Sequence, residues 1–379
     1  MTARRKAGGG PPIWAVGLVG LAIAAGFALR VLVPHGLNPT IFLALGEDSH
    51  VQTSYARDLL GDVVTRPDLG HDGRFFFPQA NDPWYLDPQM HAAVLDRPVY
   101  RGQRMLFPML AGGFGLFPPH AIAWAMLITN VVAFGLGTLL AARLAQTWGA
   151  SPLLGLAIPL NIGLIFELDI GGAGVLAYVL CVAAVYSLSQ GREWPAATLL
   201  AGAALSREVM LLFAAGLLVV YWLREHRFQW RLLALPVIAM GIWHIYLRIQ
   251  LEGVVGEGGG REAFAPPFVG MWQAFMLWAE EPADLLLGVT MLAVVVVFAL
   301  RAIRSRQPLA WGALPFVALV TTLSVYVWRE PVDLSRALAP VFTAYAFVLF
   351  AKDDAAPSSI APVESAPSER ESADRHRSG

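Results

Sequence analysis

Long apolar runs separated by short polar segments dominate the chain. A membrane-spanning helix needs roughly 20 consecutive apolar residues, with about 17 to 25 tolerated. Applied along the chain, this criterion predicts an all-α polytopic membrane protein with about ten transmembrane helices. The predicted spans are 13–33, 119–143, 152–168, 172–189, 194–206, 208–223, 231–250, 284–302, 309–328 and 335–351.

Two apolar segments fit this scheme less simply. The run 194–206 is short for a full crossing, and Arg207–Glu208 separates it from the next run. We interpret that pair as the outer turn of a helical hairpin, with one long helix over 195–223 as the alternative. The segment 105–117 is apolar but short, and Pro118–Pro119 ends it, which favours a helix lying on the membrane or dipping into it.

The distribution of Arg and Lys predicts the orientation, because cytoplasmic loops carry an excess of these residues. With the N-terminus inside, only Glu193 and Glu225 oppose twelve inner basic residues, whereas the outer face collects 20 of the 28 acidic residues. A single helix over 195–223 would move three of the basic residues outside, so the hairpin is preferred and both termini are expected to be cytoplasmic. The inner basic residues are Arg4, Arg5, Lys6, Arg143, Arg192, Arg224, Arg227, Arg231, Arg301, Arg304, Arg306 and Lys352.

The domain organisation follows from these spans. Residues 1–351 are predicted to form a single transmembrane domain, with a large non-cytoplasmic loop at 34–104 and a second outer loop at 251–283. The first loop is too long to be a mere connector and is expected to contain short amphipathic helices. Residues 352–379 are mostly Ser, Pro, Ala and charged residues, which is typical of a disordered tail.

Composition agrees with a membrane location. Hydrophobic residues make up 56% of the chain, charged residues only 15%, and the mean hydropathy is +0.55. The single cysteine, Cys181, excludes an intrachain disulfide framework and a Cys-based metal site. The first apolar run is too long for a signal-peptide core, so it is interpreted as a retained helix. We expect a multi-pass protein of the inner or plasma membrane, in contact with membrane lipid and without a nucleic-acid partner.

Polar residues that could carry chemistry gather in the first outer loop. One cluster runs from Gly46 to His50, and a second from Gly70 to Pro83. A third follows at residues 95–104. Carboxylates, arginines and aromatic rings here are predicted to lie beside the membrane, where a sugar and a lipid phosphate can meet. The candidates in this loop are Glu47, Asp48, Asp72, Arg74, Gln79, Asp82, Tyr100, Arg101 and Arg104.

Each candidate also has an ordinary structural interpretation. Asp48 could cap the helix that follows it by accepting an orphan backbone N–H. Asp72 and Asp82 stand in Asp-Gly and Asp-Pro pairs, which are common turn sequences. Phe75–Phe77 could anchor the loop at the membrane interface. Arg101 could pair with a lipid headgroup or a local carboxylate.

Ionisable residues next to apolar runs are more informative. Arg207 and Glu208 lie between two such runs, where ionisable groups are costly and usually face a bundle interior or a water-filled cavity. A structural ion pair, mutual or with a neighbour, is the alternative. Asp169 and Arg336 are predicted near the outer ends of their spans. An arginine there suits a phosphate, because its planar fork matches phosphate oxygens and keeps its charge.

The plan of one helix, a long outer loop with an early acidic motif and then many helices resembles the GT-C class of integral membrane glycosyltransferases. The arrangement Asp48…Tyr55-Ala56 is similar to the acidic motif in their first loop. The stretch 72–83, with Tyr100-Arg101 and Arg104 behind it, resembles a bacterial subgroup linked to cell-surface glycopolymers. Residues 205–208 resemble a motif between two mid-chain helices of that subgroup.

The resemblance implies a GT-C-like fold and transfer of a sugar from a polyprenyl-phosphate donor to a cell-envelope glycan or lipid acceptor on the non-cytoplasmic face. It implies Asp48 as the catalytic base, with Asp72 as the competing candidate. No metal site is predicted, although a divalent cation bridging carboxylates is compatible with this chemistry. The expected donor-phosphate ligands are Arg207, Arg336 and Arg104, and the expected substrate-binding residues are Glu47, Arg74, Gln79, Asp82, Tyr100, Arg101, Asp169 and Glu208.

Two other functional classes stay open. A transporter or flippase for lipid or polysaccharide also needs ionisable residues within the membrane, but more often shows internal repeats and interrupted helices in matching halves. No clear repeat is visible in this sequence. A non-catalytic partner in glycopolymer assembly is the second alternative, and for it we expect Asp48→Asn to leave product formation intact.

Overall fold

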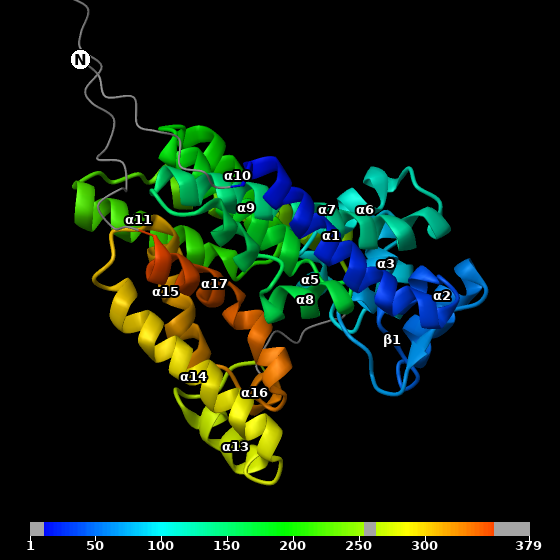
Figure 1. Ribbon diagram of the computed structural model, residues 1–379. Helices are drawn as coiled ribbons and strands as arrows, with labels where there is room; N and C mark the ends of the chain where they lie inside the picture. Colours follow the sequence, from blue (N-terminus) through cyan, green and yellow to red (C-terminus); the bar gives the residue numbers. More distant parts are fainter. Residues whose placement is uncertain (1–10, 254–262, 352–379) are drawn as a thin grey trace, which may run out of the picture.

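The computed structural model describes residues 11–253 and 263–351. The predicted tail at 352–379 and part of the second outer loop, 254–262, lie outside the described residues. Within those described ranges the chain is helical apart from a small parallel pair, β1 (Leu45–Gly46) and β2 (Thr65–Arg66) (Figure 1). The all-α prediction is therefore confirmed.

Within the described ranges, five helices are long and apolar enough to cross a membrane, and three shorter helices are also apolar. Such a set of helices is typical of an integral membrane protein, while ten crossings and the GT-C-like arrangement stay predictions. The long helices are α1 (Ile13–Leu32), α7 (Pro119–Thr147), α12 (Arg231–Gln250), α14 (Pro282–Ala302) and α17 (Pro331–Phe350). The shorter ones are α9 (Gly174–Ser189), α11 (Met210–Glu225) and α15 (Pro308–Thr321).

The helix connections gather at two ends of the molecule (Figure 1). At one end, called the basic end below, an ion pair joins Arg231 to Glu193 and a hydrogen bond joins Arg224 to the carbonyl of Ile303. The opposite end carries the loop 34–104 and is called the loop end (Figure 1). Which end faces the cytoplasm stays a prediction.

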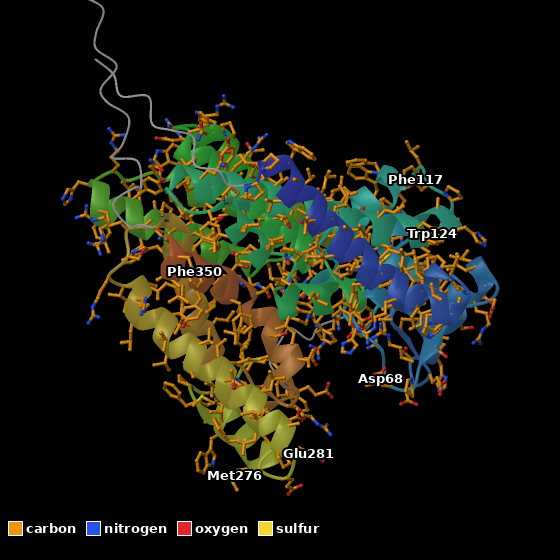
Figure 2. All side chains as sticks on the ribbon, viewed as in Figure 1. Asp68, Phe117, Trp124, Met276, Glu281 and Phe350 are labelled. Carbon is orange, nitrogen blue, oxygen red and sulfur yellow. The ribbon has the colours of Figure 1, made fainter. Side chains whose placement is uncertain are left out.

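Side chains on the outside of the bundle match a lipid environment along its length. Trp124 on α7, Met276 on α13 (Val269–Trp278) and Phe350 at the end of α17 are all exposed. Figure 2 shows these side chains on the surface of the molecule, and it places Asp68 and Glu281 at the edge that carries the outer loops. Exposed apolar surface of this extent is typical of contact with membrane lipid.

The predicted span 152–168 is wrong, because two pieces take the place of one helix. The 3₁₀ helix η4 (Pro152–Ala157) is followed by α8 (Ile162–Asp169). Asn161 separates them: its side-chain oxygen accepts from two backbone N–H groups at the start of α8, and its amide donates to the Ala339 carbonyl on α17. The cap and the contact with α17 therefore decide where α8 begins.

The predicted span 309–328 is also interrupted. Helix α15 ends at Thr321, and α16 covers only Val325–Trp328. The second outer loop inserts its backbone at the break, where Phe264 forms an isolated bridge with Leu323. Backbone groups freed by the break are thus satisfied by another segment of the chain, as burial requires.

The interruption at Arg207 is confirmed. Helix α10 (Glu193–Ser206) ends there, because Arg207 has an extended backbone, and α11 begins at Met210. One long helix over 195–223 is therefore wrong. Helix α10 packs against α9 and α12, whereas α11 packs mainly against α15. The turn between α10 and α11 consequently lies at the loop end, where the chain passes from the α9 and α12 side of the bundle to α15.

The first outer loop folds into short helices, as predicted. In the segment 105–117 that follows this loop, α6 and the 3₁₀ helix η3 cover most of the residues, and both are too short to cross a membrane. The helices and 3₁₀ helices of this region are η1 (Val33–His35), η2 (Pro39–Leu43), α2 (His50–Leu60), α3 (Gly73–Asn81), α4 (Pro88–Val94), α5 (Pro98–Gly102), α6 (Leu106–Ala111) and η3 (Gly113–Gly115).

Candidate functional site

A cavity of about 400 Å³ opens at the loop end of the bundle. The first outer loop, the turn between α10 and α11, and α17 supply its polar wall. Helices α15 and α16 and the end of the second outer loop supply an apolar wall. The polar lining comprises His71, Asp72, Tyr100, Arg101, Gln103, Arg104, Arg207, Glu208, Asp333 and Arg336, and the large apolar lining comprises Phe264, Phe316, Leu319, Leu323, Tyr326 and Val327.

Asp72 occupies the residue before α3, and the glycine after it fixes its place. The Gly73 N–H donates to the Ile170 carbonyl at 3.0 Å. A Cβ at Gly73 would lie 2.8 Å from the carbonyl oxygens of Ile170, Leu43 and Phe42. Only glycine allows this close approach. The Asp-Gly pair is therefore more than a turn, because it docks Asp72 against the end of α8.

Three arginines surround the Asp72 carboxylate. Arg336 donates a hydrogen bond to one of its oxygens, Arg101 Nη1 lies 3.5 Å from the other, and Arg104 Nη1 lies 3.7 Å away. Burial raises the pKa of Asp72, but the charges of Arg336, Arg104 and Arg101 outweigh burial and hold that pKa well below its usual range. Asp72 is consequently an ionised carboxylate in this arrangement.

Glu167 on α8 forms ion pairs with two of the cavity arginines. It is 1% exposed, and its Oε1 accepts from Arg207 Nη1 and from Arg336 Nε, both at 2.7 Å. Its Oε2 accepts from the Gly174 backbone N–H at 2.9 Å. The sequence analysis missed this role for Glu167. A carboxylate within the apolar run 152–168 was the available signal, because such groups are costly in a membrane unless paired.

Arg104 forms the second strong pair of the site. Its Nε and Nη2 donate to the two oxygens of Glu208 at 2.8 and 2.7 Å, and Nη2 also donates to the Tyr100 hydroxyl at 3.0 Å. Two parallel bonds fix both position and orientation. Arg207 and Glu208 therefore pair with Glu167 and Arg104, respectively, rather than with each other.

No family model, curated protein or solved structure matches the chain. The geometry of the cavity is therefore the basis for a functional proposal.

Arg101 contacts Asp96, Phe75 and Asp72. It donates to both oxygens of Asp96 at 2.9 Å, and its guanidinium lies 3.9 Å from the centre of the Phe75 ring. It also faces Asp72 across 3.5 Å. Its position on the cavity rim is set mainly by Asp96 and Phe75, and Arg336 is the arginine in closest contact with Asp72.

The predicted base Asp48 lies outside the cavity lining. Glu47 and Asp48 are exposed in the turn before α2, where the Asp48 backbone N–H donates to the Asp68 carbonyl. Ser49, not Asp48, holds the N-cap position of α2, so the capping interpretation of Asp48 is wrong. Of the two candidate bases, only Asp72 lines the cavity.

Arg74 and Gln79 also lie outside the cavity lining, on α3. The Arg74 guanidinium lies 4.5 Å from the centre of the Phe75 ring. Gln79 is buried, and its amide donates to the Phe75 carbonyl at 2.9 Å within the same helix. Both side chains pack the inside of the first outer loop.

Asp82 and Asp169 have structural partners elsewhere. Asp82 Oδ2 lies 3.1 Å from Nε2 of the buried His91 and so ties α3 to α4. Asp169, at the end of α8, pairs with Arg66 at 2.9 Å and lines a separate apolar groove beside α1. Neither residue lines the cavity that holds Asp72.

No three His, Cys, Asp or Glu side chains in the described ranges are placed to hold a metal ion together. The polar wall instead presents guanidinium groups close to a carboxylate. Arg207 donates one of its five N–H groups to Glu167 and has others available to a ligand. Arg336 and Arg104 flank Asp72 from α17 and the loop. The arrangement can bind an anionic group beside an ionised carboxylate.

Proposed function

We propose that the chain is a membrane glycosyltransferase that moves a sugar from a polyprenyl-phosphate donor to a glycan or lipid acceptor. One observation carries this proposal: Asp72 and the three arginines Arg104, Arg207 and Arg336 line one cavity, opposite an apolar wall. A lipid-linked sugar phosphate needs both surfaces. The resemblance to GT-C enzymes in residues 72–83 and 205–208 supports the same reaction.

The arginines suit the phosphate of the donor. Arg207 has N–H groups beyond the one bound by Glu167, and Arg336 and Arg104 lie on the other side of Asp72. Negative charge that grows on the leaving phosphate is stabilised by fixed cations in a site shielded from water. The apolar wall at Leu323 and Tyr326 offers a surface for the first isoprene units.

Asp72 is the proposed base. The acceptor oxygen attacks the anomeric carbon, and the bond from that carbon to the phosphate oxygen breaks with its electron pair staying on the phosphate. The proton of the acceptor hydroxyl goes to Asp72, as general base catalysis requires. The product is a new glycosidic bond, and polyprenyl phosphate is released.

Donor binding would also prepare Asp72 for this step. In the structure Arg336 and Arg104 hold the Asp72 pKa well below its usual range, which makes the carboxylate a weak base. A donor phosphate competes for the same guanidinium groups and adds negative charge nearby. Both effects raise the pKa of Asp72. Base strength therefore increases only when donor is present.

The test uses full-length protein in lipid nanodiscs with radiolabelled polyprenyl-phosphate mannose, glucose or arabinose and a crude envelope acceptor. Wild type is compared with Asp72→Asn and Asp48→Asn. We expect transfer by wild type and a loss of about 10²- to 10⁴-fold in Asp72→Asn, which is the usual contribution of a general base. Asp48→Asn should retain most of the activity.

A matched control is Asp58→Asn, which removes an exposed carboxylate on α2 outside the cavity lining. Thermal unfolding of each variant shows whether the fold is retained. Equal transfer by wild type and Asp72→Asn would contradict the proposed base. Absence of transfer from every donor would contradict the glycosyltransferase and favour a transporter or an assembly partner.

A further inference from the structure

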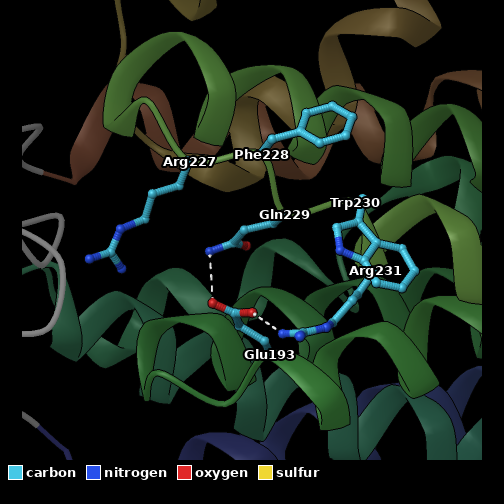
Figure 3. Close-up of a pocket in the computed structure, with 6 residues that line it drawn as sticks. All are labelled: Glu193, Arg227, Phe228, Gln229, Trp230 and Arg231. Carbon is cyan, nitrogen blue, oxygen red and sulfur yellow. Dashed lines mark hydrogen bonds and ion pairs between the residues drawn. The ribbon is translucent and has the colours of Figure 1, made fainter.

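A second cavity, of about 250 Å³, lies at the basic end of the bundle. It is formed by the start of α10, the loop between α11 and α12, and the first residue of α12. The side chains that line it belong to Glu193, Arg227, Phe228, Gln229, Trp230 and Arg231 (Figure 3).

The polar groups of this cavity are only partly satisfied within the protein. Glu193 accepts from Gln229 Nε2 and from Arg231 Nη1, both at 3.3 Å. The Arg231 Nε and Gln229 Oε1 atoms are buried without a hydrogen-bond partner. In Figure 3 the Arg227 guanidinium points away from Glu193, and it forms no ion pair with a described residue. Glu193 thus pairs with Arg231, while Arg227 lies in the same cavity without a contact to this carboxylate.

Aromatic side chains surround these charges. The Arg231 guanidinium lies 5.0 Å from the centre of the Trp194 ring and 5.7 Å from that of Trp230. Trp194 is 57% exposed, Trp230 51% and Phe228 65%. Tryptophan at this depth is typical of the boundary between lipid tails and headgroups. We therefore expect the cavity to lie at headgroup level, next to α10, α11 and α12.

The surroundings add positive charge. Arg224 is exposed at the end of α11, and it donates to the Ile303 carbonyl, which brings the loop after α14 against this region. Arg192 is exposed immediately before α10. An excess of arginine alone is expected on a cytoplasmic face. That rule for membrane orientation does not explain why Arg227 lies in a cavity beside exposed aromatic residues, without an ion pair to a residue that the structure describes.

We propose that this cavity binds the phosphate of an anionic lipid headgroup from the adjacent leaflet. Arg227 and the exposed part of the Arg231 guanidinium are the phosphate ligands, since guanidinium groups match phosphate oxygens and the Arg231 side chain is 39% exposed. Trp194, Trp230 and Phe228 contact the glycerol and upper acyl region. The exposed aromatic residues favour a lipid over free phosphate, because a soluble ion needs no apolar contacts. This site is at the opposite end from Asp72 and does not depend on the proposed glycosyl transfer.

The experiment is native mass spectrometry of the full chain released from nanodiscs that contain equal amounts of phosphatidylglycerol and phosphatidylcholine. We expect wild type to retain phosphatidylglycerol selectively. Each arginine near an anionic lipid surface contributes to the binding free energy. Arg227→Gln should therefore weaken lipid binding about fivefold, and the double variant Arg227→Gln with Arg231→Gln about thirtyfold. Inorganic phosphate, added as a separate arm, should not displace the lipid.

Two controls make the result specific. Arg143→Gln removes the same charge from an exposed position near the end of α7, outside this cavity, and should leave lipid retention unchanged. The double Lys variant of Arg227 and Arg231 keeps the charge and should retain most of the binding, which separates loss of ligand groups from loss of fold. Equal retention by wild type and the double Gln variant would overturn the proposal. Displacement of lipid by inorganic phosphate would overturn the lipid as the occupant.

Discussion

The two ends of the bundle place arginine in opposite surroundings. At the loop end, Arg207 and Arg336 converge on Glu167, whose side chain is only 2% exposed, and each guanidinium is about 15% exposed. At the basic end, Arg231 is 39% exposed and shares a half-buried Glu193 with Gln229. Arg207 and Arg336 are therefore held by a buried carboxylate, whereas Arg231 is more exposed to solvent or lipid.

The difference has an energetic consequence. A buried charge that loses its partner costs several kcal/mol, because nothing replaces the lost solvation. An exposed ion pair contributes about 0–1 kcal/mol and is weakened by salt. The loop-end cluster therefore fits the proposed chemistry, which needs groups held in place, and the basic end fits the proposed exchange of partners with lipid.

Glu167→Gln at the loop end should cause the greatest loss of stability. The substitution leaves Arg207 and Arg336 without their shared counter-charge, while the amide oxygen still accepts from Gly174. Removal of one partner from a buried pair costs about 3–5 kcal/mol. Thermal or denaturant unfolding in lipid nanodiscs measures the change in the free energy of unfolding.

The matched variant at the basic end is Glu193→Gln. Its carboxylate is 30% exposed, and its partner Arg231 is 39% exposed, so the expected loss is about 0–1 kcal/mol. Equal losses for the two variants would contradict the contrast between the two ends. A small loss for Glu167→Gln alone would show that Arg207 and Arg336 find other partners.

Gly73→Ala tests whether the loop-end cluster depends on the backbone that carries Asp72. The added Cβ would meet three backbone carbonyl oxygens at 2.8 Å, and backbone cannot rotate away as a side chain can. We expect a loss of about 2–3 kcal/mol, as for overpacking of a core, and a reduction of the proposed glycosyl transfer. Gly26→Ala on α1 is the control, because its Cβ meets nothing within 4 Å and alanine favours a helix.

Much of the fold could be predicted, because long apolar runs must become buried or lipid-facing helices. The positions of α1, α7, α9, α12 and α14 follow from length and hydropathy alone. The interruptions at Asn161 and Leu323 could not be predicted in this way. They depend on an amide that bonds to α17 and on a backbone bridge from a distant loop. Both contacts exist only after the chain has folded.

The sequence indicates which kinds of residue form the candidate site, but it does not indicate which of them lie together in the cavity. Arginines at the ends of apolar runs are unusual enough to single out Arg207 and Arg336. Nothing local indicates that Asp72 and Arg336, 264 positions apart, meet in one cavity. Asp48 stands in an equally suggestive motif, yet it lies in an exposed turn. Contacts between residues far apart in the chain could therefore not be predicted, however distinctive the local motif.

Acid should weaken the loop-end cluster through Asp72, with a smaller effect than either Glu167→Gln or Gly73→Ala. The pKa of Asp72 is held below its usual range by Arg336, Arg104 and Arg101 against the effect of burial. A folded-state pKa below the unfolded value contributes stability above that unfolded value, about 4, and the contribution is lost as pH falls further. A charge-assisted hydrogen bond of this kind contributes about 1.5 kcal/mol.

The measurement is the difference in the free energy of unfolding between wild type and Asp72→Asn in nanodiscs at a series of pH values. We expect a constant difference from about pH 8 to pH 5 and a decrease below about pH 4, because asparagine does not titrate. The basic-end variant Arg227→Gln should show no such convergence with wild type, since it removes a group that stays charged throughout. A difference for Asp72→Asn that is unchanged at low pH would mean that the arginines hold the aspartate by shape rather than by charge.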